Sequence, residues 1–109
     1  VKKVYYPGLK SHKGYEINKA QSEGAGAVLS FELNSPELTH RLLNEMQYAA
    51  FAVSLGGVES IISYPPMMSH AAMPPAERAA RGISDSLVRL SLGVEDTEDV
   101  LRDILRIID

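Results

Sequence analysis

Arg89 is the residue whose type and position most directly suggest chemistry in this chain. It lies in "SDSLVRLSLGVED" (Ser84–Asp96), whose alternating pattern predicts a strand with one apolar face formed by Val88, Leu90 and Leu92. Arg89 falls on the opposite face of that strand. A guanidinium is always charged and is very costly to bury without a partner. Arg89 therefore requires an anionic partner.

Two kinds of anion fit this position. The residues by themselves favour a structural ion pair with a local carboxylate, and the candidates are Asp85, Glu95 and Glu59. The alternative is a guanidinium fork that binds the carboxylate or phosphate of a ligand through two parallel hydrogen bonds. The pattern of this stretch does not separate a permanent partner from an exchangeable one.

The stretch "SLGG" (Ser54–Gly57) is a second candidate site. Glycines after a strand allow a ligand or another backbone to approach closely, and they expose backbone N–H groups to an anion. The spacing matches neither a dinucleotide-binding motif nor a P-loop. A plain turn between two strands is therefore the simpler interpretation, with an anion site at Ser54 as the alternative.

The histidines provide no third candidate. They lie far apart at His12, His40 and His70, and none has the spacing of a metal-binding motif, so we expect no metal site. No motif supports a hydrolase built on the adjacent pair Ser69 and His70.

The order of predicted elements indicates an α+β fold. The elements are a strand beginning at Lys2, a helix over Gly14–Gln21, a strand over Ala27–Leu33, a helix over Pro36–Gln47 capped by Ser35, strands within Ala50–Gly57 and Val58–Pro65, a helix over Pro75–Arg81 ended by Gly82, the Arg89 strand, and a helix from Thr97 capped by Asp96. Short links between strands favour a small antiparallel or mixed sheet with the helices packed on one face. The last helix is expected to bury Val100, Leu101, Ile104, Leu105 and Ile108.

Composition narrows the class of protein. The 109 residues fit one domain, 1–109, and 45% hydrophobic with 23% charged residues is ordinary for a soluble chain. No apolar run approaches the roughly 18 residues of a membrane span. Eleven basic and 14 acidic residues without a basic run argue against a nucleic-acid partner. The absence of cysteine fits a cytoplasmic protein, and the start without methionine suggests a fragment.

Four stretches, taken together and in order, resemble a known family. They are "VYYPGLKSH", "GAGAVLSFEL", "VSLGGVESIISYPPMMSHA" and "RGISDSLVRLSLGVEDTEDVLRDI". They resemble the C-terminal domain of the Cys/Met-metabolism, or trans-sulfuration, family of pyridoxal-phosphate enzymes over essentially the whole chain. The resemblance implies the C-terminal domain of a fold-type I enzyme. It also implies a sulfur amino-acid substrate, a pyridoxal-phosphate cofactor bound by the protein's own N-terminal domain, and a cytoplasmic homotetramer.

The resemblance also implies roles for single residues. Arg89 would bind the substrate α-carboxylate. Ser54 would lie against that carboxylate and the lysine that carries the cofactor, with the Leu55 backbone beside it. Val53 would face the substrate side chain, and Ser69, at a position where threonine is commoner in the family, would lie near the arginine.

The resemblance places no catalytic residue in this chain. The Schiff-base lysine, the phosphate-binding residues and the aromatic residue that stacks on the cofactor would belong to the larger preceding domain. None of the lysines lies in a matching motif; they are Lys2, Lys3, Lys10, Lys13 and Lys19. The isolated chain is therefore expected to be inactive and to bind pyridoxal phosphate weakly or not at all.

Several reactions stay open within the resemblance. Cystathionine β- or γ-lyase comes first, and cystathionine γ-synthase, an O-acylhomoserine sulfhydrylase and methionine γ-lyase are the alternatives. Two readings outside catalysis also remain. One is a module that binds an amino acid through Arg89 and Ser54, and the other is a structural or oligomerisation domain with Arg89 in an internal salt bridge.

Overall fold

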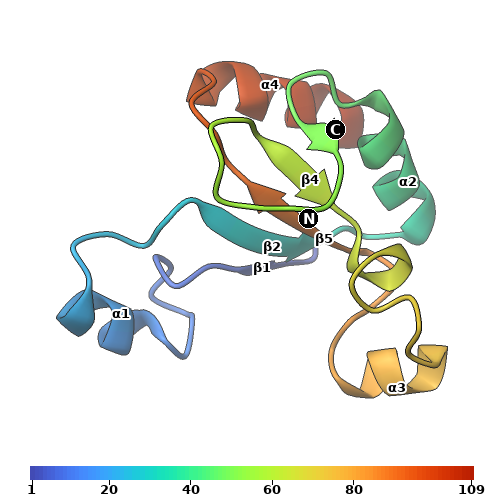
Figure 1. Cartoon of the computed structure of the whole chain (residues 1–109), viewed down its shortest axis with the longest axis horizontal. Coiled ribbons are helices and arrows are strands. Elements are labelled where there is room, and N and C mark those ends of the chain that lie inside the picture. The colour runs from blue at the N-terminus through green and yellow to red at the C-terminus, as the bar shows by residue number, and fades with distance from the viewer.

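Five strands form one mixed sheet in the order β1-β2-β5-β4-β3 (Figure 1). The strands are β1 (Lys3–Tyr5), β2 (Val28–Glu32), β3 (Ala50–Phe51), β4 (Ile61–Ser63) and β5 (Leu87–Ser91). β3 pairs with β4 in parallel, and the other neighbouring pairs are antiparallel. The structure, a computed structural model, describes residues 1–109 without a gap. The α+β class and the mixed sheet expected from the sequence are confirmed.

Two of the four α-helices cover one face of this sheet. The helices are α1 (Tyr15–Gln21), α2 (Pro36–Glu45), α3 (Pro75–Ala80) and α4 (Thr97–Ile108), with a 3₁₀ helix, η1 (Pro65–Met67). Figure 1 shows α2 and α4 side by side on the sheet, with α1 and α3 apart from them at two ends of the molecule. The prediction that all helices pack on one face is therefore wrong for α1 and α3. Neither helix buries a residue, because each is short and carries too few large apolar side chains for a core-facing stripe.

The core lies between the sheet and the α2–α4 pair. Its members are Phe31, Leu33, Leu42, Leu43, Ala49, Ile62, Tyr64, Val88, Leu90 and Ile107. Val88 and Leu90 are both buried, which confirms the predicted apolar face of the Arg89 strand. Arg89 consequently projects from the face of the sheet opposite to α2 and α4.

Side-chain caps fix where the two packed helices begin. Ser35 Oγ accepts the Leu38 backbone N–H at 3.1 Å at the start of α2. Asp96 Oδ1 accepts the backbone N–H of Glu98 at 2.9 Å at the start of α4. Both caps agree with the sequence pattern, since a short oxygen-bearing side chain satisfies amides that lack a helical acceptor.

The buried face of α4 differs from the prediction. Leu101 and Leu105 were expected in the core, but they are 46% and 39% exposed, whereas Asp103 is 3% exposed. The helix is rotated so that Val100, Asp103 and Ile107 face inward. A carboxylate tolerates this position only because hydrogen bonds replace the water it loses.

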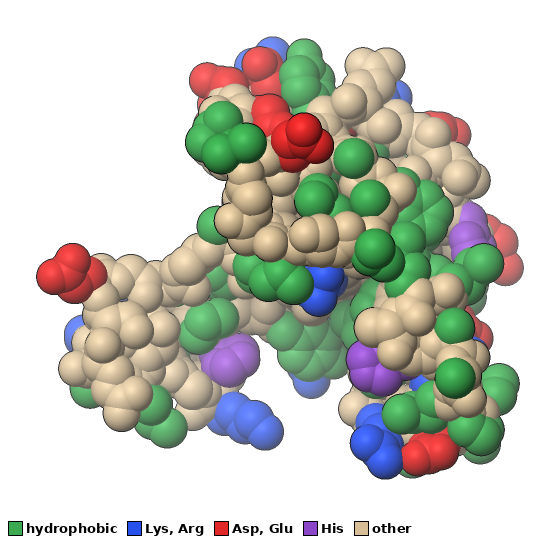
Figure 2. Space-filling view, viewed as in Figure 1, with side chains coloured by type: hydrophobic (Ala, Val, Ile, Leu, Met, Phe, Trp, Pro, Cys, Tyr) green, Lys and Arg blue, Asp and Glu red, His purple; other side chains and the backbone are tan.

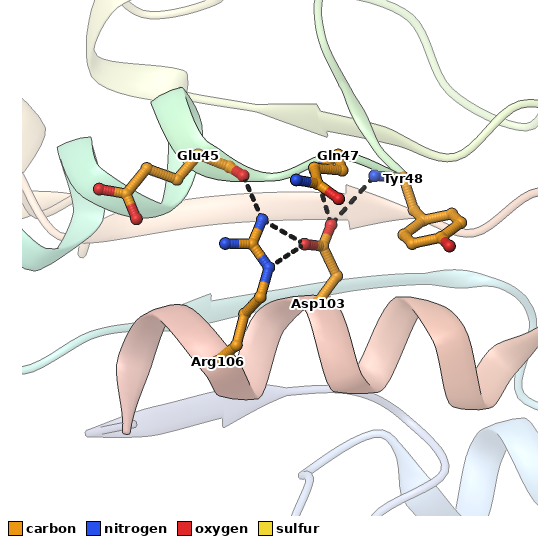
Figure 3. Close-up of polar contacts among 5 residues, drawn as sticks. All are labelled: Glu45, Gln47, Tyr48, Asp103 and Arg106. Carbon is orange, nitrogen blue, oxygen red and sulfur yellow. Dashed lines mark hydrogen bonds and ion pairs between the residues drawn. The ribbon is translucent and has the colours of Figure 1, made fainter.

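Those hydrogen bonds join α4 to the end of α2 (Figure 3). Asp103 Oδ2 accepts the backbone N–H groups of Gln47 at 2.7 Å and Tyr48 at 3.0 Å. Arg106 Nη2 lies 2.7 Å from Asp103 Oδ1 and donates to the Glu45 carbonyl at 2.6 Å. One ion pair on α4 thus satisfies both amides and a carbonyl where α2 ends, which secures the two helices on the sheet.

Candidate functional site

Arg89 stands in a row of polar side chains that crosses the uncovered face of the sheet. Tyr5 on β1 pairs with Ser30 on β2, Ser30 pairs with Arg89 on β5, and Arg89 pairs with Ser63 on β4. Directly paired residues on neighbouring strands project from the same face. The row therefore supplies hydroxyl groups, and no carboxylate, to the strand positions on either side of the guanidinium.

Arg89 is the one arginine in the chain without an ion pair. The other five each lie near a carboxylate, at distances from 2.7 to 3.9 Å; they are Arg41, Arg78, Arg81, Arg102 and Arg106. None of the carboxylates expected as structural partners contacts Arg89. Asp85 pairs with Arg78, and Glu95 accepts a hydrogen bond from Ser60. Glu59 has no cationic partner. The interpretation of Arg89 as a structural ion pair is wrong.

Hydrogen bonds from one nitrogen hold the Arg89 guanidinium in place. Nη2 donates to the Ser54 carbonyl at 3.1 Å and to Ser63 Oγ at 3.4 Å. Arg89 Nε is buried and has no acceptor. A guanidinium offers five N–H donors in one plane, and most of these are left without a partner within the chain. The arrangement fits an incoming anion that accepts two of them.

Ser54 has an unusual backbone conformation at this point. Its φ is +116°, and it is the only residue other than glycine with a positive φ. Such a conformation costs of order 1–3 kcal/mol in a residue with a side chain, so surrounding contacts must impose it. The result is that the Ser54 carbonyl points at Arg89, while its hydroxyl stays exposed and free of intrachain hydrogen bonds.

Ser54 belongs to the β3–β4 loop (residues 52–60), which is fixed by the chain that leaves β5. Ser91 Oγ accepts the Gly56 backbone N–H at 2.8 Å, and the Val94 N–H donates to the Val58 carbonyl at 2.9 Å. Gly93 permits this contact, because a Cβ there would collide with the Val58 carbonyl. The two sequence candidates, "SLGG" and the Arg89 stretch, are therefore parts of one site.

The residues on either side of Ser54 are apolar and exposed. Val53 is 67% exposed and Leu55 is 53% exposed, and the Leu55 backbone N–H makes no hydrogen bond within the chain. Figure 2 shows hydrophobic side chains exposed across the front of the molecule, with a basic side chain among them near the centre of the view. A ligand held by Arg89 would thus meet an apolar rim and a free amide.

Ser69 is not joined to this site by a hydrogen bond. Its hydroxyl lies 2.7 Å from His70 Nδ1 in the exposed segment after η1. Its expected place near Arg89 remains a prediction.

The sequence of the whole chain matches one family. A profile described as "Cys/Met metabolism PLP-dependent enzyme" matches residues 1–108. The chain belongs to this family. Its resemblance to the family, inferred above from four stretches, is thereby confirmed.

Curated relatives in the family act on sulfur amino acids by name. The chain is 60% identical over 103 residues to cystathionine beta-lyase of Bacillus subtilis strain 168, covering 94% of this chain and 26% of that protein. It is 50% identical over 105 residues to cystathionine gamma-synthase of Escherichia coli strain K12, covering 95% and 27%. The chain thus spans about a quarter of the length of the relatives it matches.

A solved structure of the family has the same fold. The cystathionine gamma synthase of Xanthomonas oryzae pv. oryzae, in complex with cystathionine, superposes with a TM-score of 0.91 at 46% identity. The match covers 99% of this chain and 28% of that one. The mixed sheet with its two packed helices is therefore a recurrent unit of the family.

The lysines of this chain belong to other elements than Ser54 and Arg89 do. All the lysines lie within residues 2–19, in or around β1 and α1, whereas Ser54 and Arg89 lie on the β3–β4 loop and β5. Lys3 and Lys19 place their ammonium groups over the rings of Tyr5 and Tyr15. No lysine makes a hydrogen bond to Ser54 or Arg89, whose partners are each other and Ser63. The donors at the site suit a carboxylate and offer no amine for a Schiff base.

The structure shows neither a metal-binding cluster nor a membrane-spanning helix. No group of three His, Asp or Glu side chains gathers where it could hold a metal ion. No helix combines the length and apolar character needed to cross a membrane.

Three site residues were missed from the sequence. Ser63 contacts Arg89 from the neighbouring strand, Ser91 holds Gly56, and Ser60 binds Glu95. All three serines are buried, at 4%, 1% and 2% exposure. Ser91 carried a usable signal, because it lies two residues after Arg89 and shares its face. Ser60 and Ser63 carried none, since their partners, Glu95 and Arg89, come from segments far along the chain.

Proposed function

We propose that this chain is the substrate-carboxylate domain, at the C-terminal end, of a pyridoxal-phosphate enzyme that cleaves or forms the C–S bond of a sulfur amino acid. Cystathionine is the proposed substrate, and a β-lyase or γ-lyase reaction is proposed first. The names of the relatives support this choice, led by a cystathionine beta-lyase at 60% identity. A cystathionine γ-synthase, a sulfhydrylase or a methionine γ-lyase is the alternative, since a synthase and a methionine lyase are 50% and 48% identical.

One observation carries the proposal: Arg89 is the only arginine without a carboxylate, and it stands beside exposed backbone. A guanidinium fork with free donors binds a carboxylate in two parallel hydrogen bonds, which fixes the direction as well as the position of the anion. The α-carboxylate of an amino acid is such an anion. Arg89 would therefore set the orientation of the bonds at the substrate Cα.

The surrounding residues refine this orientation. Ser54 would add its exposed hydroxyl, and Leu55 its free amide, as further donors to the same carboxylate. Val53 and Leu55 would contact the apolar part of the substrate side chain. Holding a substrate at several points removes rotational freedom that would otherwise oppose the reaction.

The cofactor would be held by the remainder of the protein. Bound pyridoxal phosphate supplies electron withdrawal from the substrate Cα, and the residues of this chain bind and orient the carboxylate. We accordingly expect the isolated chain to be inactive. A homotetrameric assembly and a cytoplasmic location belong to the same proposal.

The experiment is a kinetic comparison in the whole enzyme. Arg89→Ala is expected to raise KM for cystathionine by about 100-fold, on the scale of the roughly 1.5–3 kcal/mol of a hydrogen bond to a charged group. Arg89→Lys keeps the charge but loses the fork, so it is expected to recover only part of the affinity. Arg102→Ala, at an exposed arginine on α4, is the matched control.

The products identify the reaction. Pyruvate from cystathionine indicates β-cleavage, and α-ketobutyrate indicates γ-cleavage. An unchanged KM in Arg89→Ala would contradict the role given to Arg89. Carboxylate binding that depends on Arg89, without turnover of any sulfur amino acid, would instead indicate a non-catalytic binding module.

A further inference from the structure

The β3–β4 loop contacts Arg89 near its start and is buried at its end. Near its start, Ser54 presents its carbonyl to Arg89. At its end, Ser60 is 2% exposed and precedes β4. The loop joins two parallel strands without a crossover helix, so it must return along the sheet in nine residues. Its path therefore depends on contacts made by other parts of the chain.

Glu95 makes two of these contacts, both to Ser60. Its Oε1 accepts the Ser60 backbone N–H at 2.9 Å, and its Oε2 accepts the Ser60 hydroxyl at 2.6 Å. The hydroxyl oxygen in turn accepts the Gly93 backbone N–H at 2.9 Å. The Gly93 amide thus donates to the Ser60 hydroxyl, and the Ser60 hydroxyl donates to the Glu95 carboxylate. An ionised carboxylate suits this place because it offers only acceptors.

Glu95 does not act as the counter-ion of Arg89. The polar partners of Arg89 are the Ser54 carbonyl and Ser63 Oγ, and no carboxylate lies within salt-bridge distance. Any influence of Glu95 on the anion site through hydrogen bonds must therefore pass through the loop. The hydrogen bond from the Ser60 hydroxyl and, to a smaller extent, the one from the Ser60 amide lower the pKa of Glu95. The carboxylate therefore remains ionised near neutral pH.

We propose that Glu95 is a positioning residue for the Arg89 anion site, because it clamps Ser60 and so fixes the loop that carries Ser54. This inference rests on the carboxylate role proposed for Arg89. Loss of the clamp frees the Ser60 end of the loop, and only the contacts at Gly56 and Val58 then hold the strained Ser54 conformation. The Ser54 carbonyl would leave Arg89, and the guanidinium would lose one of the contacts that aim it.

The sign of the effect separates positioning from simple electrostatics. Glu95 is negative, so if it acted on the bound anion only through its charge, Glu95→Gln would strengthen anion binding. If Glu95 positions the loop, Glu95→Gln weakens binding, because an amide replaces one of the two acceptors with a donor. Glu59→Gln removes a charge of the same sign from the loop itself, at an exposed residue with no partner next to Ser60, and is the matched control.

The test measures acetate binding to the whole enzyme by ligand-observed NMR, together with cystathionine kinetics. Acetate has a carboxylate and no amine, so it reports the Arg89 site without any reaction. Glu95→Gln is expected to weaken acetate binding and to raise KM by roughly tenfold, the scale of 1.4 kcal/mol. Glu59→Gln is expected to leave both within about twofold, as for an exposed charge.

A double-mutant comparison completes the test. In an Arg89→Ala background, Glu95→Gln should have no further effect on acetate binding, because the two residues act on one site. Independent, additive effects would overturn the inference, and so would unchanged or tighter binding in Glu95→Gln. Failure of the proposed function looks different: acetate binding then still depends on Arg89 and Glu95, but cystathionine is not converted.

Discussion

Asp103 and Tyr48 are joined directly across the two packed helices, although 55 residues separate them in the chain: the Tyr48 backbone N–H donates to Asp103 Oδ2 at 3.0 Å. The same oxygen accepts the Gln47 N–H, and Arg106 supports the carboxylate from one turn further along α4. A buried carboxylate therefore closes the end of α2. The segment that follows leads into β3 and then into the loop that carries Ser54.

Replacing Asp103 should loosen this end of the helix pair. We expect Asp103→Ala to lower the free energy of unfolding by about 2–4 kcal/mol, because two amides and the Arg106 guanidinium lose a buried partner. Urea unfolding measures this loss, and faster hydrogen exchange at the Gln47 and Tyr48 amides localises it. Asp99→Ala, which breaks only a surface pair with Arg102, should cost less than about 1 kcal/mol. Equal losses in the two variants would contradict the role of Asp103.

The same carboxylate should make stability depend on pH in the acid range. Burial raises the pKa of Asp103, but hydrogen bonds from the Tyr48 and Gln47 amides and the charge of Arg106 outweigh it, so the pKa lies below the ordinary 3.8. Between these two values the unfolded chain binds more protons than the folded one. The contribution of Asp103 to stability is thus complete above the ordinary pKa and is lost as pH falls through the lowered one.

Asp103→Asn gives the reference for this pH dependence, because asparagine does not titrate. We expect the stability difference between the wild type and Asp103→Asn to be constant near neutral pH and to shrink below about pH 4. Urea midpoints measured from pH 2 to pH 6 test this. A difference that grows as the pH falls would show that the folded-state pKa is raised instead.

Ser54 allows the backbone and the hydroxyl to be tested separately. Ser54→Gly should retain or raise stability by up to about 1 kcal/mol, because glycine adopts a φ of +116° without strain. Ser54→Ala keeps the strain and removes only the hydroxyl, so we expect little change in stability. Both variants should weaken carboxylate binding if the hydroxyl contacts the ligand. Weaker binding in Ser54→Gly alone would assign the effect to the backbone.

Gly93 should tolerate no side chain. Gly93→Ala would drive a Cβ into the Val58 carbonyl, so we expect a loss of about 2 kcal/mol or more, or a shifted β3–β4 loop with weaker acetate binding. Gly24→Ala is the control, because a Cβ there has no neighbour within 4 Å. A stable Gly93→Ala variant with unchanged acetate binding would show that the contact with Val58 is dispensable.

Local patterns were sufficient to predict most of the fold. Alternation identified the buried face of β5, and Ser35 and Asp96 correctly marked the starts of α2 and α4. Local patterns failed where a distant group decided the outcome. Leu105 was expected to be buried on α4, but the amides after α2 draw Asp103 inward and rotate the helix.

Local patterns were likewise insufficient to predict the surroundings of the candidate site. Arg89 was found from its position on a strand, but the residues near it in the sequence suggested carboxylate partners that it does not contact. The sheet instead places Ser63 beside it, and the loop places the Ser54 carbonyl there. Strand order and loop path are set by long-range pairing, which no single stretch reveals.

The segment from Arg89 to Glu95 contacts the β3–β4 loop at regular intervals. Arg89, Ser91, Gly93 and Glu95 recur at every second residue and meet Ser54, Gly56, Val58 and Ser60 in the same order. Because every second residue of segment 89–95 contacts every second residue of segment 54–60, the two segments must have equal length. An insertion of one residue in either segment would shift every later partner to the wrong side. A second insertion of one residue in the other segment would bring the contacting residues opposite one another again. We therefore expect the lengths of the two segments to change together or not at all.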